Sequence, residues 1–175
     1  MSITSTNRKI HKWGSIIIAL PLLVILATGI LLLLKKELSF IQPPTAKGSV
    51  QHSQSAPEIS FDDILAAAQS VPDAQITTWQ DIDRLDVRPS KGIVKIRSHN
   101  SIEIQIDSHS GDIIQIAQRN SDLIESIHDG TFFQKNANLW LMLPAALTAL
   151  TLLITGLVLF FSPYVKRHQR RRKSQ

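Results

Sequence analysis

The sequence contains no cysteine, and two long stretches of it contain no charged residue. Without cysteine the chain forms no disulfide and offers no thiol as a nucleophile or metal ligand. Residues 13–34 and 136–165 lack Asp, Glu, Lys and Arg. An ion or proton path through a membrane needs ionisable groups along it, so these two stretches argue against such a path through this chain alone. The sequence also lacks a phosphate loop, an HExxH pair and a G-x-S-x-G elbow, so no enzyme activity is predicted.

The two uncharged stretches are long enough to cross a membrane. The first has 22 residues (34 − 13 + 1), and at about 1.5 Å per residue it spans roughly 33 Å. The second is most apolar between about Leu139 and Phe161. We predict transmembrane helices over 13–34 and 137–163. A cleaved signal peptide is the alternative for the first, but its apolar part exceeds the usual length of about 7–15 residues and no small-x-small site precedes Lys35.

Charge is distributed unevenly around these two helices. Residues 1–12 hold three Lys or Arg and no acid, and residues 164–175 hold six and no acid. Residues 35–138 hold ten basic and fourteen acidic residues, a net charge of −4. Basic flanks stay in the cytoplasm, so both tails are predicted there, in a bacterial cytoplasmic (inner) membrane, with residues 35–138 on the periplasmic side. The run KRHQRRRK at 166–173 has no interleaved aromatic residue and follows a span, which favours anionic lipid over nucleic acid as its partner.

The segment between the spans divides into a linker and a small folded domain. Residues 35–58 are predicted to be a linker because 41–58 are rich in Pro, Ser, Gln and Gly. The domain is assigned to 59–130. Ser60 and Asp63 resemble a capping box in front of a short helix with apolar residues at helical spacing, ending at Pro72. Residues 75–79 and 81–89 are predicted strands.

The strongest strand pattern runs from Ile93 to Ala117. A three-residue loop at 99–101 pairs Ile96 with Ile104 and Val94 with Ile106, and it also sets Arg97 opposite Glu103. A second loop at 109–111, with Gly111 in the left-handed position, pairs Ile104 with Ile116 and Ile106 with Ile114. The first helix is expected to cover the apolar face, and a helix over 121–128 leads back to the membrane. The predicted fold class is therefore α+β: two transmembrane helices flanking a helix packed on an antiparallel β-meander.

Two of the six histidines lie at membrane edges. His11 precedes the first span and His128 precedes the second. Such histidines serve as interfacial anchors or as axial ligands of haem. They are expected near opposite bilayer faces, about 30 Å apart, so one chain cannot hold one haem between them and a second copy or a partner would have to complete the site. No other metal site is predicted.

Each span also contains a Thr-Gly pair. These are Thr28-Gly29 and Thr155-Gly156. Small residues allow close approach of helix backbones in lipid, so the pairs are predicted to serve helix packing.

Three segments together resemble PepSY-associated membrane proteins. HKWGSIIIALPLLVILATG (11–29) is similar to the family's first helix, and DLIESIHDGTFF (122–133) followed by the helix with Thr155-Gly156 is similar to its closing helix. SIEIQIDSHSGDIIQI (101–116) resembles the end of a PepSY domain. The resemblance implies a small extracytoplasmic domain that binds or regulates another protein, as proposed for PepSY domains in peptidase propeptides.

The function expected is a non-enzymatic binding or regulatory module without a cofactor, acting on a protein partner such as a peptidase or on a second copy of itself. The alternative comes from longer relatives that reduce siderophore iron and bind haem through histidines. In that case the chain is an accessory or subunit of such a system, and His11 and His128 are the positions that match the family's haem ligands.

Overall fold

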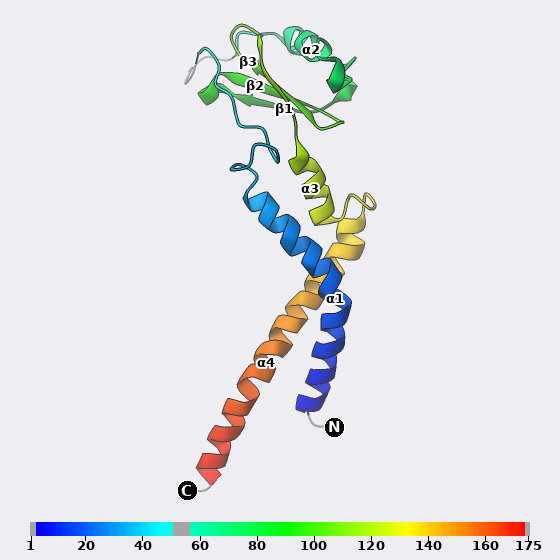
Figure 1. Ribbon diagram of the computed structural model, residues 1–175, viewed down its shortest axis with the longest axis vertical. Coiled ribbons are helices and arrows are strands. Elements are labelled where there is room, and N and C mark those ends of the chain that lie inside the picture. The colour runs from blue at the N-terminus through cyan, green and yellow to red at the C-terminus, as the bar shows by residue number, and fades with distance from the viewer. Residues whose placement is uncertain (1–2, 51–56, 174–175) are drawn as a thin grey trace. The chain divides into compact units, whose positions relative to one another are not determined.

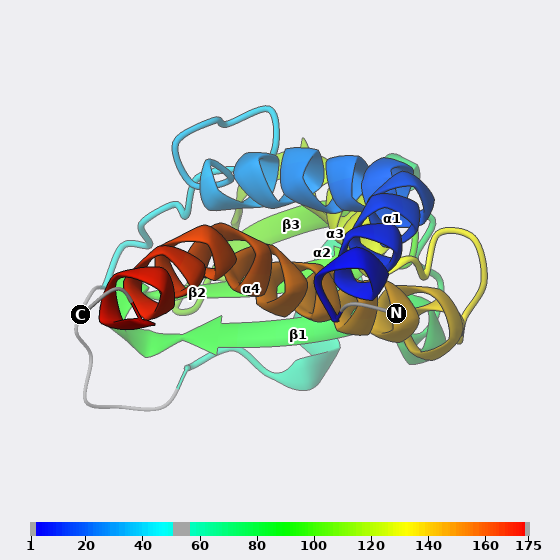
Figure 2. The same ribbon diagram turned by 90° about the horizontal axis from the view of Figure 1, so that it is seen from below.

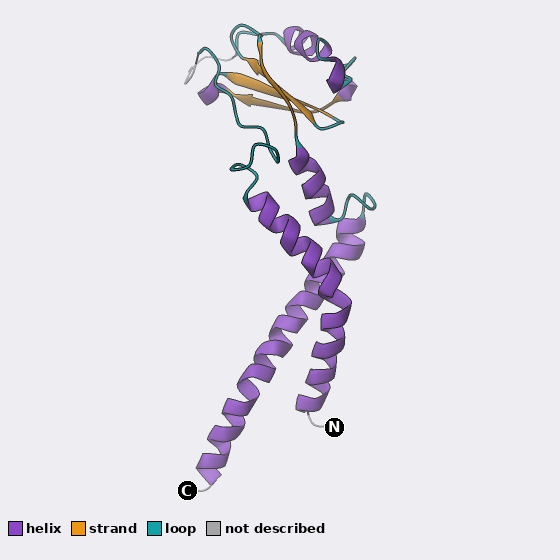
Figure 3. Cartoon of the chain, in the orientation of Figure 1, coloured by secondary structure: helices purple, strands orange, loops and turns teal. Residues whose placement is uncertain are grey.

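The computed structural model describes residues 3–50 and 57–173, which form two compact units. The first contains residues up to 30 and from 125, and the second contains residues 31–124. Figure 3 distinguishes the helices from the single sheet. In chain order the helices and strands are α1 (Ile3–Leu33), α2 (Phe61–Gln69), β1 (Ile82–Arg88), β2 (Ile93–Ser98), β3 (Ile102–Asp107), β4 (Ile113–Gln118), α3 (Asn120–Asp129), a π-helical turn (Asn138–Met142) and α4 (Leu143–Lys173).

The four strands form one antiparallel sheet in the order β1-β2-β3-β4. Figure 2 shows β1, β2 and β3 side by side in this sheet. Ile96 faces Ile104, Val94 faces Ile106 and Arg97 faces Glu103, so the predicted register of β2 and β3 is confirmed. Gly111 has a φ of +80°, as the second turn requires. The sheet and the two membrane-length helices confirm the predicted α+β fold class.

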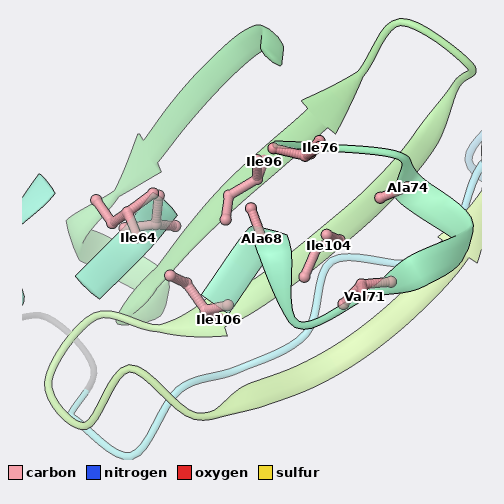
Figure 4. Close-up of a cluster of buried hydrophobic side chains, with 9 residues drawn as sticks. Ile64, Ala68, Val71, Ala74, Ile76, Ile96, Ile104 and Ile106 are labelled. Carbon is pink, nitrogen blue, oxygen red and sulfur yellow. The ribbon is translucent and has the colours of Figure 1, made fainter. Parts of the chain in front are cut away.

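The core lies between α2 and one face of the sheet. Ser60 caps α2 by accepting from the backbone N–H of Asp63, whose carboxylate in turn accepts from the backbone N–H of Ser60. Ile64 and Ala68 of α2 belong to one buried cluster with the isoleucines of the sheet (Figure 4). The buried cluster consists of Ile64, Ala68, Val71, Ala74, Ile76, Val94, Ile96, Ile104 and Ile106.

Two predictions about the sheet are wrong in detail. Residues 75–79 are not a strand. The backbone N–H groups of Thr77 and Thr78 both donate to the carboxylate of Asp81, and Thr78 caps a short 3-10 helix at Trp79–Asp81. A register shift between Gln105 and Ile106 pairs Ile106 with Ile113 instead of Ile114.

A further bulge in β1 decides which side chains share a face. The register shifts between Ile82 and Arg84, so Ile82 packs against the core while Arg84 lies opposite Arg97 on the other face. A bulge inserts one residue and reverses the alternation beyond it. Strict alternation from the sequence places Ile82 and Arg84 on one face, which the structure contradicts.

The other unit is built from two long helices that cross (Figure 1). Its membrane-length segments are Ser5–Leu33 and Asn138–Val165, each apolar enough to span a bilayer. α1 contains Pro21 and changes direction along its length (Figure 1), as expected where a proline removes a backbone hydrogen bond. A Cβ atom at Gly14 of α1 would lie 3.0 Å from Leu152 of α4, so the absence of a side chain lets these helices touch.

Candidate functional site

Each Thr-Gly pair holds one of the two membrane-edge histidines. His11 on α1 places its Nδ1 atom 2.9 Å from the hydroxyl of Thr155 on α4. His128 on α3 places its Nδ1 atom 2.9 Å from the hydroxyl of Thr28 on α1. Both histidines are half-buried. The same arrangement therefore occurs twice in one unit, made from different helices.

The glycine of each pair makes room for the imidazole ring. A Cβ atom at Gly156 would lie 3.2 Å from Cε1 of His11, and one at Gly29 would lie 3.5 Å from Cε1 of His128. The first distance is tighter than an ordinary van der Waals contact, whereas the second is ordinary. Each Thr-Gly pair therefore receives a histidine ring from another helix, and the role of the pairs in helix packing stays a prediction.

The hydrogen bonds of the threonine hydroxyls favour one tautomer of each ring. The Thr28 hydroxyl lies 2.6 Å from the carbonyl oxygen of Val24, and the Thr155 hydroxyl lies 3.1 Å from that of Leu152. A hydroxyl that donates to its helix carbonyl accepts from the histidine, which corresponds to the tautomer with the proton on Nδ1. A neutral ring protonated at Nδ1 keeps a lone pair on Nε2, and neither Nε2 atom has a partner among the described residues.

This tautomer fits the chemistry of one axial haem ligand at each histidine. Metal-binding histidines commonly donate their second ring nitrogen to an oxygen, which orients the ligating nitrogen. The two sites are separated, since Thr28 lies 17 residues (28 − 11) after His11 on α1, or about 25 Å along the helix axis. One chain therefore offers two single ligands instead of a paired site.

The face of the sheet opposite α2 carries a buried network of charges that sequence reasoning missed. The Glu103 carboxylate accepts hydrogen bonds from Lys95 Nζ at 2.9 Å, from Gln105 Nε2 at 2.7 Å and from a guanidinium nitrogen of Arg119. The side chains of Lys95, Glu103 and Arg119 are 5%, 3% and 8% exposed. Arg119 also bonds Asp122, and although burial alone would lower the pKa of Arg119, Glu103 and Asp122 raise it above its usual value. A shared carboxylate of this kind offsets part of the cost of burying the two cations.

Part of the predicted linker closes over this face. Gln105 exchanges hydrogen bonds with Ala46 N–H and Pro44 C=O, at 2.8 and 2.9 Å. Asp107 accepts from the backbone N–H of Ser49. Burial raises the pKa of Asp107, but donors from Ser49 and the following turn outweigh it and lower that pKa to about 2. We refer to residues 44–49 as the strap; residues 51–56 of the predicted linker lie outside the described residues.

The comparisons identify a family. A family model described as PepSY-associated TM region matches residues 8–175, which confirms the resemblance found in the sequence. This is not a known enzyme family, and together with the two apolar helices it makes the chain a membrane protein. No curated protein and no solved structure matches the chain.

Proposed function

The chain belongs to the PepSY-associated TM region family, and from that premise we propose that it is a non-enzymatic binding module of the bacterial inner membrane. The basic tails support a cytoplasmic location for both termini and a periplasmic location for 35–138. The module binds an extended segment of a periplasmic protein along β4. A peptidase is the class of partner that the family resemblance implies.

The observation that carries this proposal is the difference between the two edge strands. The edge strand β1 is rich in charged residues, since its seven residues include Asp83, Arg84, Asp86 and Arg88. β4 has the sequence IIQIAQ without a charge, although it is the other edge of the sheet. Natural proteins protect sheet edges with charges because an unpaired strand otherwise pairs with another chain.

The side chains of β4 add an apolar surface to this open edge. Ile113, Ile114 and Ile116 are 37%, 40% and 47% exposed, and none belongs to the buried core under α2. An added strand would gain backbone hydrogen bonds from β4 and would cover these isoleucines with alternate side chains. We therefore expect a partner segment in which every second residue is apolar.

A crosslinking experiment tests this proposal in intact membranes. A photo-reactive residue at position 114 on β4 is expected to give a discrete protein adduct, whereas the same residue at Val87 on the charged edge gives none. Ile116→Lys should abolish the adduct from position 114 by placing charge beside the edge, and Val87→Lys should preserve it. Equal adducts from both edges, or none from β4, would refute peptide binding at β4.

A second function, haem binding as an accessory of an iron or siderophore reductase system, is favoured by the tautomers of His11 and His128. Haem b held by a second copy of the chain, or by a partner, would use the free Nε2 lone pair of each ring. Because one chain supplies separated single ligands, this function requires a homo-oligomer or a larger partner.

Visible spectra of the detergent-purified full-length protein decide this second candidate. Haem predicts a Soret band that shifts on reduction and is lost in His11→Ala or His128→Ala. His99→Ala and His109→Ala, in exposed turns of the other unit, should leave it unchanged. A featureless spectrum from cells grown with ample iron and added haem precursor would eliminate haem as a cofactor.

A further inference from the structure

A cavity on the polar face of the sheet gathers most of the positive charge of the periplasmic segment. Its volume is about 250 Å³, and it is lined by ten residues, of which seven are Lys or Arg and two are acids. Residues 35–138 contain only ten basic residues in total, against fourteen acids. A segment with a net charge of −4 therefore places seven of its ten cations around one cavity.

The carboxylates nearby do not neutralise this charge. Glu103 and Asp86 line the cavity, and Asp83 and Asp122 approach Arg97 at 3.9 and 3.6 Å. With Lys35 set aside because it has an interaction of its own, these four acids against the other six cations leave a net charge of +2 (6 − 4). Arg88 is paired with Asp86, whereas Lys36 and Arg84 have no hydrogen-bond or ion-pair partner in the part of the chain that the structure describes.

The strand register forces two of these cations together. Arg84 on β1 lies directly opposite Arg97 on β2, on the same face. Like charges at directly opposed positions destabilise a sheet unless a counter-charge lies between them. The bulge after Ile82 creates this pair, because without it Arg84 would point toward the core face.

The floor of the cavity is formed by buried, ion-paired side chains. Lys95 and Arg119 are almost fully buried, and Glu103 holds both in place while using only one of the three donors of Lys95. Buried donors that are already oriented bind an anion with little reorganisation. Lys35 and Lys36 also line the cavity, and they follow the end of α1 at Leu33 by two and three residues. Part of the cavity lining is therefore only a few residues along the chain from a membrane-length helix.

We propose that this cavity binds a phosphate or phosphodiester anion, with Arg84, Arg97 and Lys36 as its principal contacts. A tetrahedral anion has enough acceptor oxygens to engage several guanidinium and ammonium groups at once. Two sources share this chemistry: the headgroup of an anionic phospholipid, and free phosphate. No residue of β4 lines the cavity, so the anion site is independent of the proposed peptide-binding function.

Titration of the full-length protein in neutral detergent tests the proposal. The probes are short-chain phosphatidylglycerol below its micelle concentration, short-chain phosphatidylcholine as the zwitterionic control, and inorganic phosphate. Phosphatidylglycerol binding that phosphate does not displace identifies a lipid site, and binding of phosphate alone identifies a free-anion site. Displacement of one by the other shows that both enter. Absence of binding for both anionic probes, or equal binding of phosphatidylcholine, overturns the proposal.

A matched pair of variants locates the site. Lys36→Gln/Arg84→Gln is expected to weaken anion binding about tenfold or more, since charge-assisted contacts are lost. Lys47→Gln/Lys91→Gln removes the same charge from exposed positions that do not line the cavity, and should leave affinity within twofold. Similar losses in both variants would show that net charge, and not this cavity, attracts the anion. The affinity of the unmodified protein must also fall as sodium chloride is raised, a check that needs no variant.

Discussion

Glu103→Gln is expected to lower the free energy of unfolding of the domain between the two spans by about 3–5 kcal/mol, as is usual when one partner of a buried ion pair is removed. The carboxylate of Glu103 is the only acid bonded to Lys95 among the described residues, and it is one of two bonded to Arg119. Glutamine keeps the shape but removes the charge, so two cations remain buried with Asp122 alone to offset them. Thermal unfolding of the full-length protein, followed by fluorescence of Trp79 in this domain, should show a midpoint roughly 15 °C or more lower.

Two further variants separate this effect from a general loss of acid. Glu37→Gln changes an exposed carboxylate in the same segment and should move the midpoint by no more than a degree or two. Lys95→Met combined with Glu103→Gln should be less destabilising than the two single effects added together, because one unpaired cation is removed with the carboxylate. Additive effects, or a Glu103→Gln variant as stable as Glu37→Gln, would contradict a buried ionic network.

The apolar face of the sheet could be predicted from the sequence because the predicted register of β2 and β3 pairs apolar residues with apolar residues. A three-residue loop puts Ile96 opposite Ile104, whereas a two-residue turn would set Arg97 opposite Ile102, and Gly111 marks the next turn. The capping box at Ser60 likewise locates the start of α2. These signals are local, and each depends on residues a few positions apart.

The polar face could not be predicted in the same way. Lys95, Glu103 and Gln105 alternate with the isoleucines and resemble the solvated side of an antiparallel sheet. Gln105 is buried under the strap, which bonds it mainly through its own backbone and so leaves no pattern in its sequence. Lys95 and Glu103 are buried together with Arg119, which follows β4 in the chain. The wrong strand at 75–79 had a readable signal, since Thr78 and Asp81 repeat the three-residue spacing of Ser60 and Asp63.

The sequence singles out the residues of the two histidine sites but does not predict which of them contact each other. His11, His128 and both Thr-Gly pairs stand out in the sequence, and each pair was assigned to helix packing. Which histidine meets which pair depends on how α1, α3 and α4 cross, since the partners are 144 and 100 positions apart. Spacing along one helix carries no information about such contacts.

Gly48→Ala is expected to detach the strap and to lower the free energy of unfolding by about 2–4 kcal/mol, through steric overlap and the loss of buried hydrogen bonds. A Cβ atom at position 48 would lie 1.9 Å from the carbonyl oxygen of Gly92, and backbone cannot give way as a flexible side chain does. Moving the strap breaks the bond from Gly48 N–H to the Lys91 carbonyl and leaves Gln105 and Asp107 without their strap partners.

Amide hydrogen exchange of the full-length protein measures this detachment directly. The amides of Ala46, Gly48 and Ser49 should lose protection in Gly48→Ala, while Lys47→Ala, at an exposed neighbour, should keep it. Unchanged protection in Gly48→Ala would show that the strap does not hold the polar face. Loss of this protection in Gly48→Ala would show that residues 44–49 of the unmodified protein are held in the folded domain and do not form a free tether. A domain fragment that begins at residue 59 would then leave Gln105 and Asp107 without their strap partners, so any binding assay on the isolated domain should use a fragment that begins before the strap.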